Sequence, residues 1–236
     1  MCLSLHQFKE IQMGKTVLIA GASGLVGSHL LNMLLTDKAV DKIYSLVRRP
    51  SKVKHEKLQE ILFDFNLSLN YQNLPTVDFG FCCLGTTIKK AGSQDAFKQV
   101  DYAYPLQLAQ ALKDNNCKDF HVITTLGADS KSSVFYSKVK GELEEALKNV
   151  EFESLSIYQP SLLLGERKES RIGEKIAMIL MPPFEFLLQG QLKKYRSIKA
   201  IDVAKGMLVN SKENTQKIKT ILSNEIKELA HSIDRK

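Results

Sequence analysis

The sequence predicts an α/β fold with a doubly wound parallel sheet, and three observations lead to this prediction. A glycine-rich turn joins the apolar run Val17–Ala20 to a segment of helical periodicity near the start of the chain. Short apolar runs then alternate with helical patterns as far as Pro160. One run, Val77–Leu84, is long and mainly apolar, as expected for the centre of a parallel sheet. Alternating strands and helices indicate βαβ units, and right-handed crossovers make the doubly wound arrangement the default.

The expected strands are short runs rich in branched and aromatic residues, bounded by polar or turn-forming positions. In chain order they are Val17–Ala20, Lys42–Val47, Leu58–Phe63, Val77–Leu84, Phe120–Thr125 and Leu155–Tyr158. Helices are expected where apolar residues recur every three or four positions, as at Phe97, Val100 and Tyr104. They cover Ser23–Leu35, Ser93–Lys113 and Ser137–Leu147.

Beyond Pro160 the alternation breaks down. Residues 165–199 contain scattered glycines and arginines and the pair Pro182-Pro183, so we expect an irregular cap over the strand ends. Three more elements should close the fold: a helix at Ile201–Val209, a strand at Lys217–Leu222 and a helix at Asn224–Ile233. The length suits a single Rossmann-like domain, 1–236, with a small C-terminal cap region that shapes the substrate site.

Charge and composition argue against several classes of function. The formal net charge is +7, but the basic residues are scattered, so we expect no nucleic-acid partner. The most apolar segment, Ile176–Leu188, is too short to span a bilayer, so no membrane is expected. The four cysteines lack metal-ligand spacing, which predicts no metal site and a reducing compartment. Because Met1–Gly14 lacks the apolar core of a secretory signal, we expect a cytoplasmic protein.

The glycine spacing G-x-x-G-x-x-G predicts the phosphate site of a dinucleotide cofactor. Gly21 permits a tight turn, Gly24 lets the backbone approach a pyrophosphate, and Gly27 lets the helix pack closely on the strand. The N–H groups of the turn and the positive end of the helix dipole then face the anion. The residues expected to line this site are Gly21, Ser23, Gly24, Leu25, Val26 and Gly27.

The end of the second strand indicates which dinucleotide binds. NAD(H) sites usually have an acidic residue here, whereas Arg48 and Arg49 offer guanidinium groups to the 2′-phosphate of NADP(H). A solvated loop is the alternative interpretation, but the position one βαβ step after the glycine turn favours NADP(H) over NAD(H). Asp64, at the end of the third strand, would lie beside the adenine or would simply form a turn.

Two further strand ends are expected to contact the cofactor, because ligands of open α/β sheets lie at the carboxyl ends of the strands. The fourth strand ends in a glycine that permits close approach to the backbone, and the sixth ends at a proline that stops the ladder. The residues expected to contact the cofactor there are Leu84, Gly85, Thr86 and Thr87, followed by Pro160, Leu162 and Leu163.

Tyr136 and Lys140 have the spacing Y-x-x-x-K, which puts both side chains on one face of a helix. An ammonium beside a phenol favours the phenolate, so the pair could move a proton to or from a carbonyl oxygen while also holding the cofactor. A helix surface could show this spacing by chance, but its position after the fifth strand favours chemistry. Thr125, with Thr124 as the alternative, ends that strand with a hydroxyl that could bond the substrate oxygen and Tyr136.

Together these residues resemble the short-chain dehydrogenase/reductase superfamily in its atypical branch, and more narrowly the Tat-interacting oxidoreductase-like proteins. The strings that carry the resemblance occur in order along the chain: Gly21-Ala-Ser-Gly24-Leu-Val-Gly27, Cys82-Cys83-Leu-Gly85-Thr-Thr87, Gly127-Ala-Asp129, Tyr136-x-x-x-Lys140-Gly-Glu142 and Pro160-x-x-Leu-Leu-x-x-Arg167-x-Glu169-Ser-Arg171. The resemblance implies a Rossmann-like fold, an NADP(H) site and a Tyr/Lys pair with a Ser or Thr partner. It also allows a homodimer or a protein partner.

Two positions depart from the superfamily pattern. Thr124-Thr125 stands where Ser is usual, and Asp101 stands where extended members often have an Asn that supports a proton relay. Two hypotheses follow. The first is an NADPH-dependent oxidoreductase that acts on a small carbonyl or alcohol substrate, with Tyr136 as acid or base. The alternative is a non-catalytic NADPH-binding regulatory or redox-sensing protein that acts through a protein partner.

Overall fold

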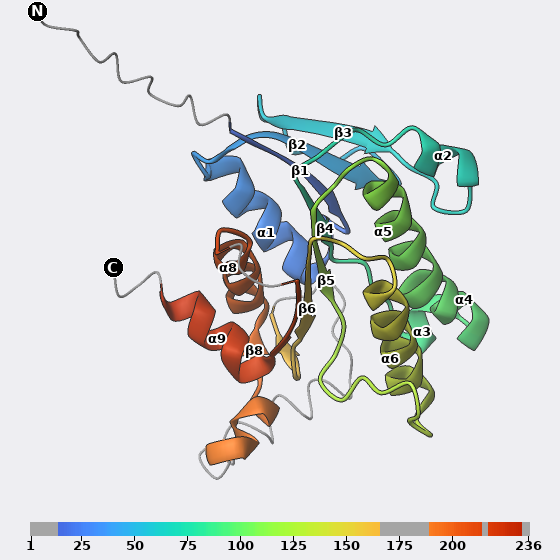
Figure 1. Cartoon of the computed structure of the whole chain (residues 1–236), viewed down its shortest axis with the longest axis vertical. Coiled ribbons are helices and arrows are strands. Elements are labelled where there is room, and N and C mark those ends of the chain that lie inside the picture. The colour runs from blue at the N-terminus through green and yellow to red at the C-terminus, as the bar shows by residue number, and fades with distance from the viewer. Residues whose placement is uncertain (1–13, 166–188, 214–216, 233–236) are drawn as a thin grey trace, which may run out of the picture.

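The computed structural model describes residues 14–165, 189–213 and 217–232. In this part of the chain a seven-stranded parallel sheet runs in the order β3-β2-β1-β4-β5-β6-β9 (Figure 1). Its strands are β1 (Lys15–Ala20), β2 (Val40–Val47), β3 (Leu58–Leu62), β4 (Phe79–Cys82), β5 (Asp119–Ile123), β6 (Ser154–Gln159) and β9 (Ile218–Leu222). The strand order confirms the predicted doubly wound, Rossmann-like fold and places β4 at the centre of the sheet.

Helices cover both faces of the sheet (Figure 1). One face packs against α1 (Leu25–Thr36), α8 (Ala200–Ser211) and α9 (Ser223–Ser232), and the other against α2 (Ser68–Gln72), α5 (Tyr104–Asp114) and α6 (Phe135–Lys148). Successive strand residues point to opposite faces, so Ile19 joins the first core and Leu18 the second. Short helical segments complete this part of the chain: α3 (Ile88–Ala91), α4 (Gln94–Lys98), the π-helical turn η1 (Gln99–Ala103) and the 3-10 helix η3 (Gly190–Tyr195).

The helix predicted over Ser93–Lys113 is wrong in one respect, because the π-helical turn η1 separates α4 from α5. Pro105 lies in the first turn of α5 and explains the break. Proline has no N–H to donate, and its ring clashes with the carbonyl oxygen four residues earlier, here that of Asp101. A wider π turn accommodates this. Its consequence is that Asp101 lies in the interior, 1% exposed.

The strand predicted over Val77–Leu84 is shorter than expected, because regular pairing covers only β4. Asp78 instead accepts a hydrogen bond from the backbone N–H of Thr16 at 2.8 Å. Most of the cap expected over 165–199 lies outside the described residues, so the cap and the single-domain expectation stay predictions. Its described end includes β8 (Ile198–Lys199), which pairs in parallel with β7 (Leu163–Leu164), a small sheet that the sequence did not predict.

Helix α6 lies directly on the loop that follows β5. A Cβ atom added at Gly141 would lie 2.2 Å from the backbone nitrogen of Ser130 and 2.6 Å from the Cα of Asp129. The Asp129 N–H also donates to the Ser137 carbonyl oxygen at 3.1 Å. Glycine therefore lets the helix that carries Tyr136 and Lys140 approach the carboxyl end of β5.

We expect Gly141→Ala to lower the free energy of unfolding by about 2 kcal/mol, because the loop must move away from the new methyl group. Chemical denaturation followed by circular dichroism measures the change. Glu142→Ala is the matched control, since it removes only a partly exposed ion pair with Lys98, worth at most about 1 kcal/mol. Equal losses in the two variants would contradict the close contact between helix and loop.

Candidate functional site

The glycine turn has the geometry of a phosphate-binding turn. Gly21 has φ +84°, a left-handed conformation that favours glycine, and a Cβ there would lie 2.6 Å from the Cys83 backbone. A Cβ at Gly27 would lie 2.2 Å from the Gly21 carbonyl oxygen. Gly24 is the N-cap of α1 and has no side chain to cap it, so no side chain of the described residues caps the first-turn N–H groups of this helix. These groups could bind an anion at the carboxyl end of β1.

The end of β2 presents two exposed arginines. In the described part of the chain, the Arg48 and Arg49 guanidinium groups form no ion pair or hydrogen bond. On the neighbouring strand β3, the two carboxylate oxygens of Glu60 accept hydrogen bonds from the Ser51 N–H at 3.0 and 3.2 Å. Asp64 is exposed, and its Oδ1 accepts hydrogen bonds from the backbone and side-chain nitrogens of Asn66. Asp64 thus has the turn-forming contacts of the alternative interpretation.

The segments that follow β4 and β6 reach the same edge of the sheet. A Cβ at Gly165 would lie 2.8 Å from the Leu25 side chain, so the chain after Leu162 and Leu163 meets the start of α1. Pro160 is buried, and its carbonyl oxygen accepts the Leu126 N–H at 2.9 Å. After β4, Leu84 and Gly85 lead to Thr86, whose N–H donates to Asp101, and to Thr87, whose hydroxyl caps α3.

Tyr136 and Lys140 lie one turn apart on α6. The Tyr136 ring is half-buried and packs on Phe97, with ring centroids 5.5 Å apart. Lys140 is 3% exposed, and its Nζ lies 2.8 Å from the Asp101 Oδ1. Burial alone lowers the pKa of the Lys140 ammonium, but the nearby Asp101 carboxylate and Tyr136 oxygen reverse the direction, and the pKa is raised. Lys140 is therefore charged at neutral pH.

The two candidate threonines have different surroundings. Thr124 is buried, and its hydroxyl donates to the Glu144 carboxylate. Thr125 is half-buried, and its hydroxyl forms no hydrogen bond to the described part of the chain. This geometry leaves Thr125 the freer of the two hydroxyls for a substrate. The assignment of either residue to catalysis stays a prediction.

Glu144 was not among the residues predicted from the sequence. It lies one turn beyond Lys140 on α6, is 6% exposed, and accepts hydrogen bonds from Thr124 and from the Gln159 amide at 2.9 Å. Burial raises the pKa of this carboxyl, and the hydrogen bonds that it accepts offset only part of the effect. The spacing of four from Lys140 was the available signal, but a helical Glu is ordinarily exposed.

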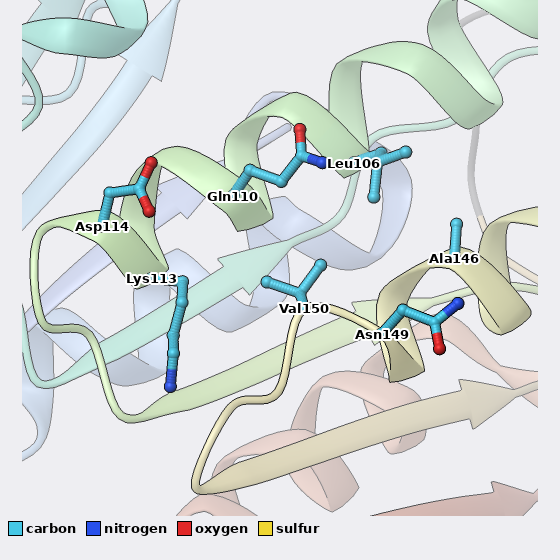
Figure 2. A pocket seen from close by; sticks show the side chains of 7 residues that line it. All are labelled: Leu106, Gln110, Lys113, Asp114, Ala146, Asn149 and Val150. Carbon is cyan, nitrogen blue, oxygen red and sulfur yellow. The ribbon is translucent and has the colours of Figure 1, made fainter.

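A surface hollow of about 600 Å³ lies away from these residues, between α5 and α6 (Figure 2). Its lining residues are Leu106, Gln110, Lys113, Asp114, Ala146, Asn149 and Val150. None of the residues predicted to bind cofactor or substrate lies among them. The Lys113 ammonium donates to the Glu151 carbonyl oxygen at 2.6 Å and so joins the end of α5 to the loop after α6.

The fold and site geometry define a protein with a short-chain dehydrogenase/reductase type of fold. MoeE5 in complex with UDP-glucose and NAD superposes with a TM-score of 0.67 at 15% identity, covering 92% of this chain and 81% of its own. A short chain dehydrogenase from Burkholderia cenocepacia in complex with NADP has a TM-score of 0.66 at 14% identity, covering 95% of each chain. At these identities the comparison shows the fold alone.

Sequence relatives identify the family. The HIM1 family matches residues 37–185, and the chain belongs to this family. Protein HTATIP2 of Rattus norvegicus is 39% identical over 179 residues, covering 74% of this chain and 73% of its own. Protein FMP52, mitochondrial, of Candida albicans is 34% identical over 168 residues, covering 69% and 73%. The resemblance to the Tat-interacting oxidoreductase-like proteins is thereby confirmed.

The expectation of a cytoplasmic location is wrong on this evidence. Relatives from Candida albicans, Emericella nidulans and Candida glabrata are all named mitochondrial. The composition argument failed because free cysteines and the polar composition of Met1–Gly14 argue only against export, and they do not separate one reducing compartment from another. Among the described residues, no helix combines the length and the apolar character needed to cross a membrane.

Glu144 predicts a pH dependence of stability. Its folded-state pKa is raised, so ionising it weakens folding. This cost is absent below the unfolded value of about 4.3 and grows as the pH rises through the folded-state pKa. We expect Glu144→Gln to gain stability relative to the wild type across that window, by at most about 1.4 kcal/mol per pH unit.

Denaturation at a series of pH values measures this difference. A constant offset from the different hydrogen bonds of the amide does not change with pH and can be subtracted. Glu145→Gln is the matched control, because this exposed neighbour pairs with Lys148 on the surface of the same helix, and its curve should run parallel to the wild type. A Glu144→Gln curve parallel to the wild type would refute the buried carboxylate.

Proposed function

We propose that the protein is an NADPH-dependent oxidoreductase acting on a small carbonyl or alcohol substrate. The observation that carries this proposal is the buried, charged Lys140 one helical turn from the half-buried Tyr136, at the carboxyl edge of the sheet. The same edge holds the glycine turn. A proton donor and an anion cradle on one sheet edge are what hydride transfer to a carbonyl requires.

The chain offers a fitting cradle for a dinucleotide. The space that a side chain would occupy at Gly21 and Gly27 is already filled by backbone, so the tight turn requires glycine there. In the described ranges no side chain caps the N–H groups at the start of α1, which leaves them to bind an anion. Arg48 and Arg49 would hold the 2′-phosphate of NADP(H). The neighbours MoeE5 and the Burkholderia cenocepacia dehydrogenase, which hold NAD and NADP respectively, support nicotinamide binding but not the choice between the two.

When bound, the nicotinamide supplies a hydride to the carbonyl carbon or accepts one from the alcohol. In the reduction, the Tyr136 hydroxyl gives its proton to the carbonyl oxygen as the C–O bond becomes single, and a phenolate remains. The Lys140 ammonium stabilises that phenolate, and the Thr125 hydroxyl would orient the substrate oxygen by a hydrogen bond. The oxidation runs through the same groups in reverse.

The two arginines provide a test of cofactor choice. We expect the double variant Arg48→Ala/Arg49→Ala to bind NADPH about tenfold more weakly or worse, because at least one charge-assisted hydrogen bond to the phosphate is lost. Its affinity for NADH should be unchanged. Titration calorimetry measures both. Lys52→Ala/Lys54→Ala removes the same charge from exposed positions of the same loop and serves as control. Equal losses for NADPH and NADH would rule out a 2′-phosphate contact.

The role of Tyr136 is tested by turnover. With NADPH and a panel of aldehydes and ketones, Tyr136→Phe should reduce kcat/KM about 100-fold or more, the usual contribution of a positioned proton donor. Tyr102→Phe, a tyrosine outside α6 that lies beside Lys98, is the control and should retain activity. Equal rates in the wild type and Tyr136→Phe would remove Tyr136 from the mechanism.

A second candidate is a regulator that senses NADPH and acts through a protein partner. The observation that favours it is the ion pair between Asp101 and the Lys140 ammonium. In this pair the carboxylate competes with a Tyr136 phenolate for the positive charge of Lys140. Tight NADPH binding without turnover of any carbonyl in the panel would support this candidate.

From the names of the fungal relatives we also propose a mitochondrial location.

A further inference from the structure

The carboxylate of Asp101 bridges two parts of the proposed site. Its Oδ1 lies 2.8 Å from the Lys140 Nζ on α6, and its Oδ2 accepts the Thr86 N–H at 2.8 Å in the segment after β4. A Cβ atom added at Gly85, the residue before Thr86, would lie 3.5 Å from the Asp101 Oδ1. One buried side chain therefore contacts both the residue that stabilises the phenolate and the segment expected to meet the cofactor.

The π-helical turn creates this bridge. Asp101 lies within η1, the turn that Pro105 makes necessary. In a regular α-helix the N–H of residue 105 would donate to the carbonyl oxygen of Asp101, but proline has no N–H. The carboxylate is 1% exposed, so its two bonds replace its contacts with water. A charge with so little exposure is retained in a protein interior when it is paired and hydrogen-bonded.

The titratable groups around Lys140 come from three elements. Asp101 approaches from η1, the Cys82 thiol from β4, and Tyr136 and Glu144 from α6 itself. Asp101 is the one of these groups in direct ion-pair contact, and the Cys82 thiol is neutral because burial raises its pKa to about 11. The positive field at Tyr136 is therefore that of an ion pair, which is weaker than the field of a lone ammonium.

We propose that Asp101 is a positioning residue that holds the Lys140 ammonium beside Tyr136 and ties it to the Gly85–Thr86 segment. This inference rests on the proposed function of Tyr136 and Lys140. The paired carboxylate also offsets the positive charge that Lys140 presents to Tyr136. Without this counter-charge the full positive field of the ammonium would act on the Tyr136 oxygen.

The test follows the ionisation of Tyr136 directly and needs no substrate. Phenolate absorbance is titrated in the full-length protein, and the signal of the matching Tyr136→Phe protein is subtracted. In Asp101→Asn the amide oxygen can still accept the Thr86 N–H, but the negative charge is gone. We expect the midpoint of the Tyr136 transition to fall by about one pH unit or more, because the Lys140 ammonium then acts on the phenol without its counter-charge.

Two variants separate this effect from general disturbance. Glu142→Gln removes one negative charge from α6 at the ion pair with Lys98 and should leave the midpoint unchanged. Lys140→Gln leaves the Asp101 carboxylate uncompensated and should raise the midpoint, while Asp101→Asn/Lys140→Gln should return it towards the wild type. If Asp101→Asn does not fold, the comparison of Lys140→Gln with the double variant makes the same test.

An unchanged midpoint in Asp101→Asn, or a double variant that stays at the midpoint of Lys140→Gln, would overturn the proposal. The readout distinguishes this failure from failure of the proposed function. A shifted midpoint in a protein that turns over no carbonyl would leave Asp101 in its role while removing catalysis. Turnover that depends on Tyr136, with no shift in Asp101→Asn, would keep the catalytic role of Tyr136 and remove the proposed role of Asp101.

Discussion

The Lys140 ammonium lies in the interior of the protein and stays charged there because the Asp101 carboxylate lies 2.8 Å away. A buried charge without such a partner would cost several kcal/mol, as a rule, or lose its proton. The pair joins α6 to the π-helical turn, and the second carboxylate oxygen joins that turn to the Thr86 N–H. Three segments from distant parts of the sequence therefore have fixed relative positions, and the shape of the candidate site depends on them.

The two faces of the sheet carry different buried polar groups. On the α5 and α6 side, at the carboxyl ends of the strands, Asp101 and Glu144 place carboxylates beside the candidate site. On the α1 and α8 side, His121 lies within hydrogen-bond distance of the Tyr158 hydroxyl, at 3.0 Å, and Asn210 donates to the same hydroxyl at 2.9 Å. The second network ties α8 to the middle of the sheet, and the Tyr158 ring at its centre belongs to the apolar core of that face.

The comparisons with known proteins and the site geometry answer different questions. Neighbours at 14–15% identity show that the Rossmann-like architecture is shared, and relatives at 34–39% identity place the chain in the HIM1 family. Neither comparison decides the chemistry, because function depends on side chains that a fold can carry in many combinations. The mitochondrial names of the fungal relatives also correct a location that composition could not determine.

The sequence by itself determined the alternation of strands and helices, the glycine turn and the helical spacing of Tyr136 and Lys140, because these follow from local spacing, and the handedness of βαβ units made the doubly wound arrangement the default. Only the tertiary structure decided what Lys140 and Thr124 contact. Asp101 and Glu144 are charged residues within helices, and local periodicity does not distinguish their side chains from exposed ones. These residues are buried because helices from separate βαβ units pack together near the strand ends. Local periodicity does not predict which helices pack against each other there.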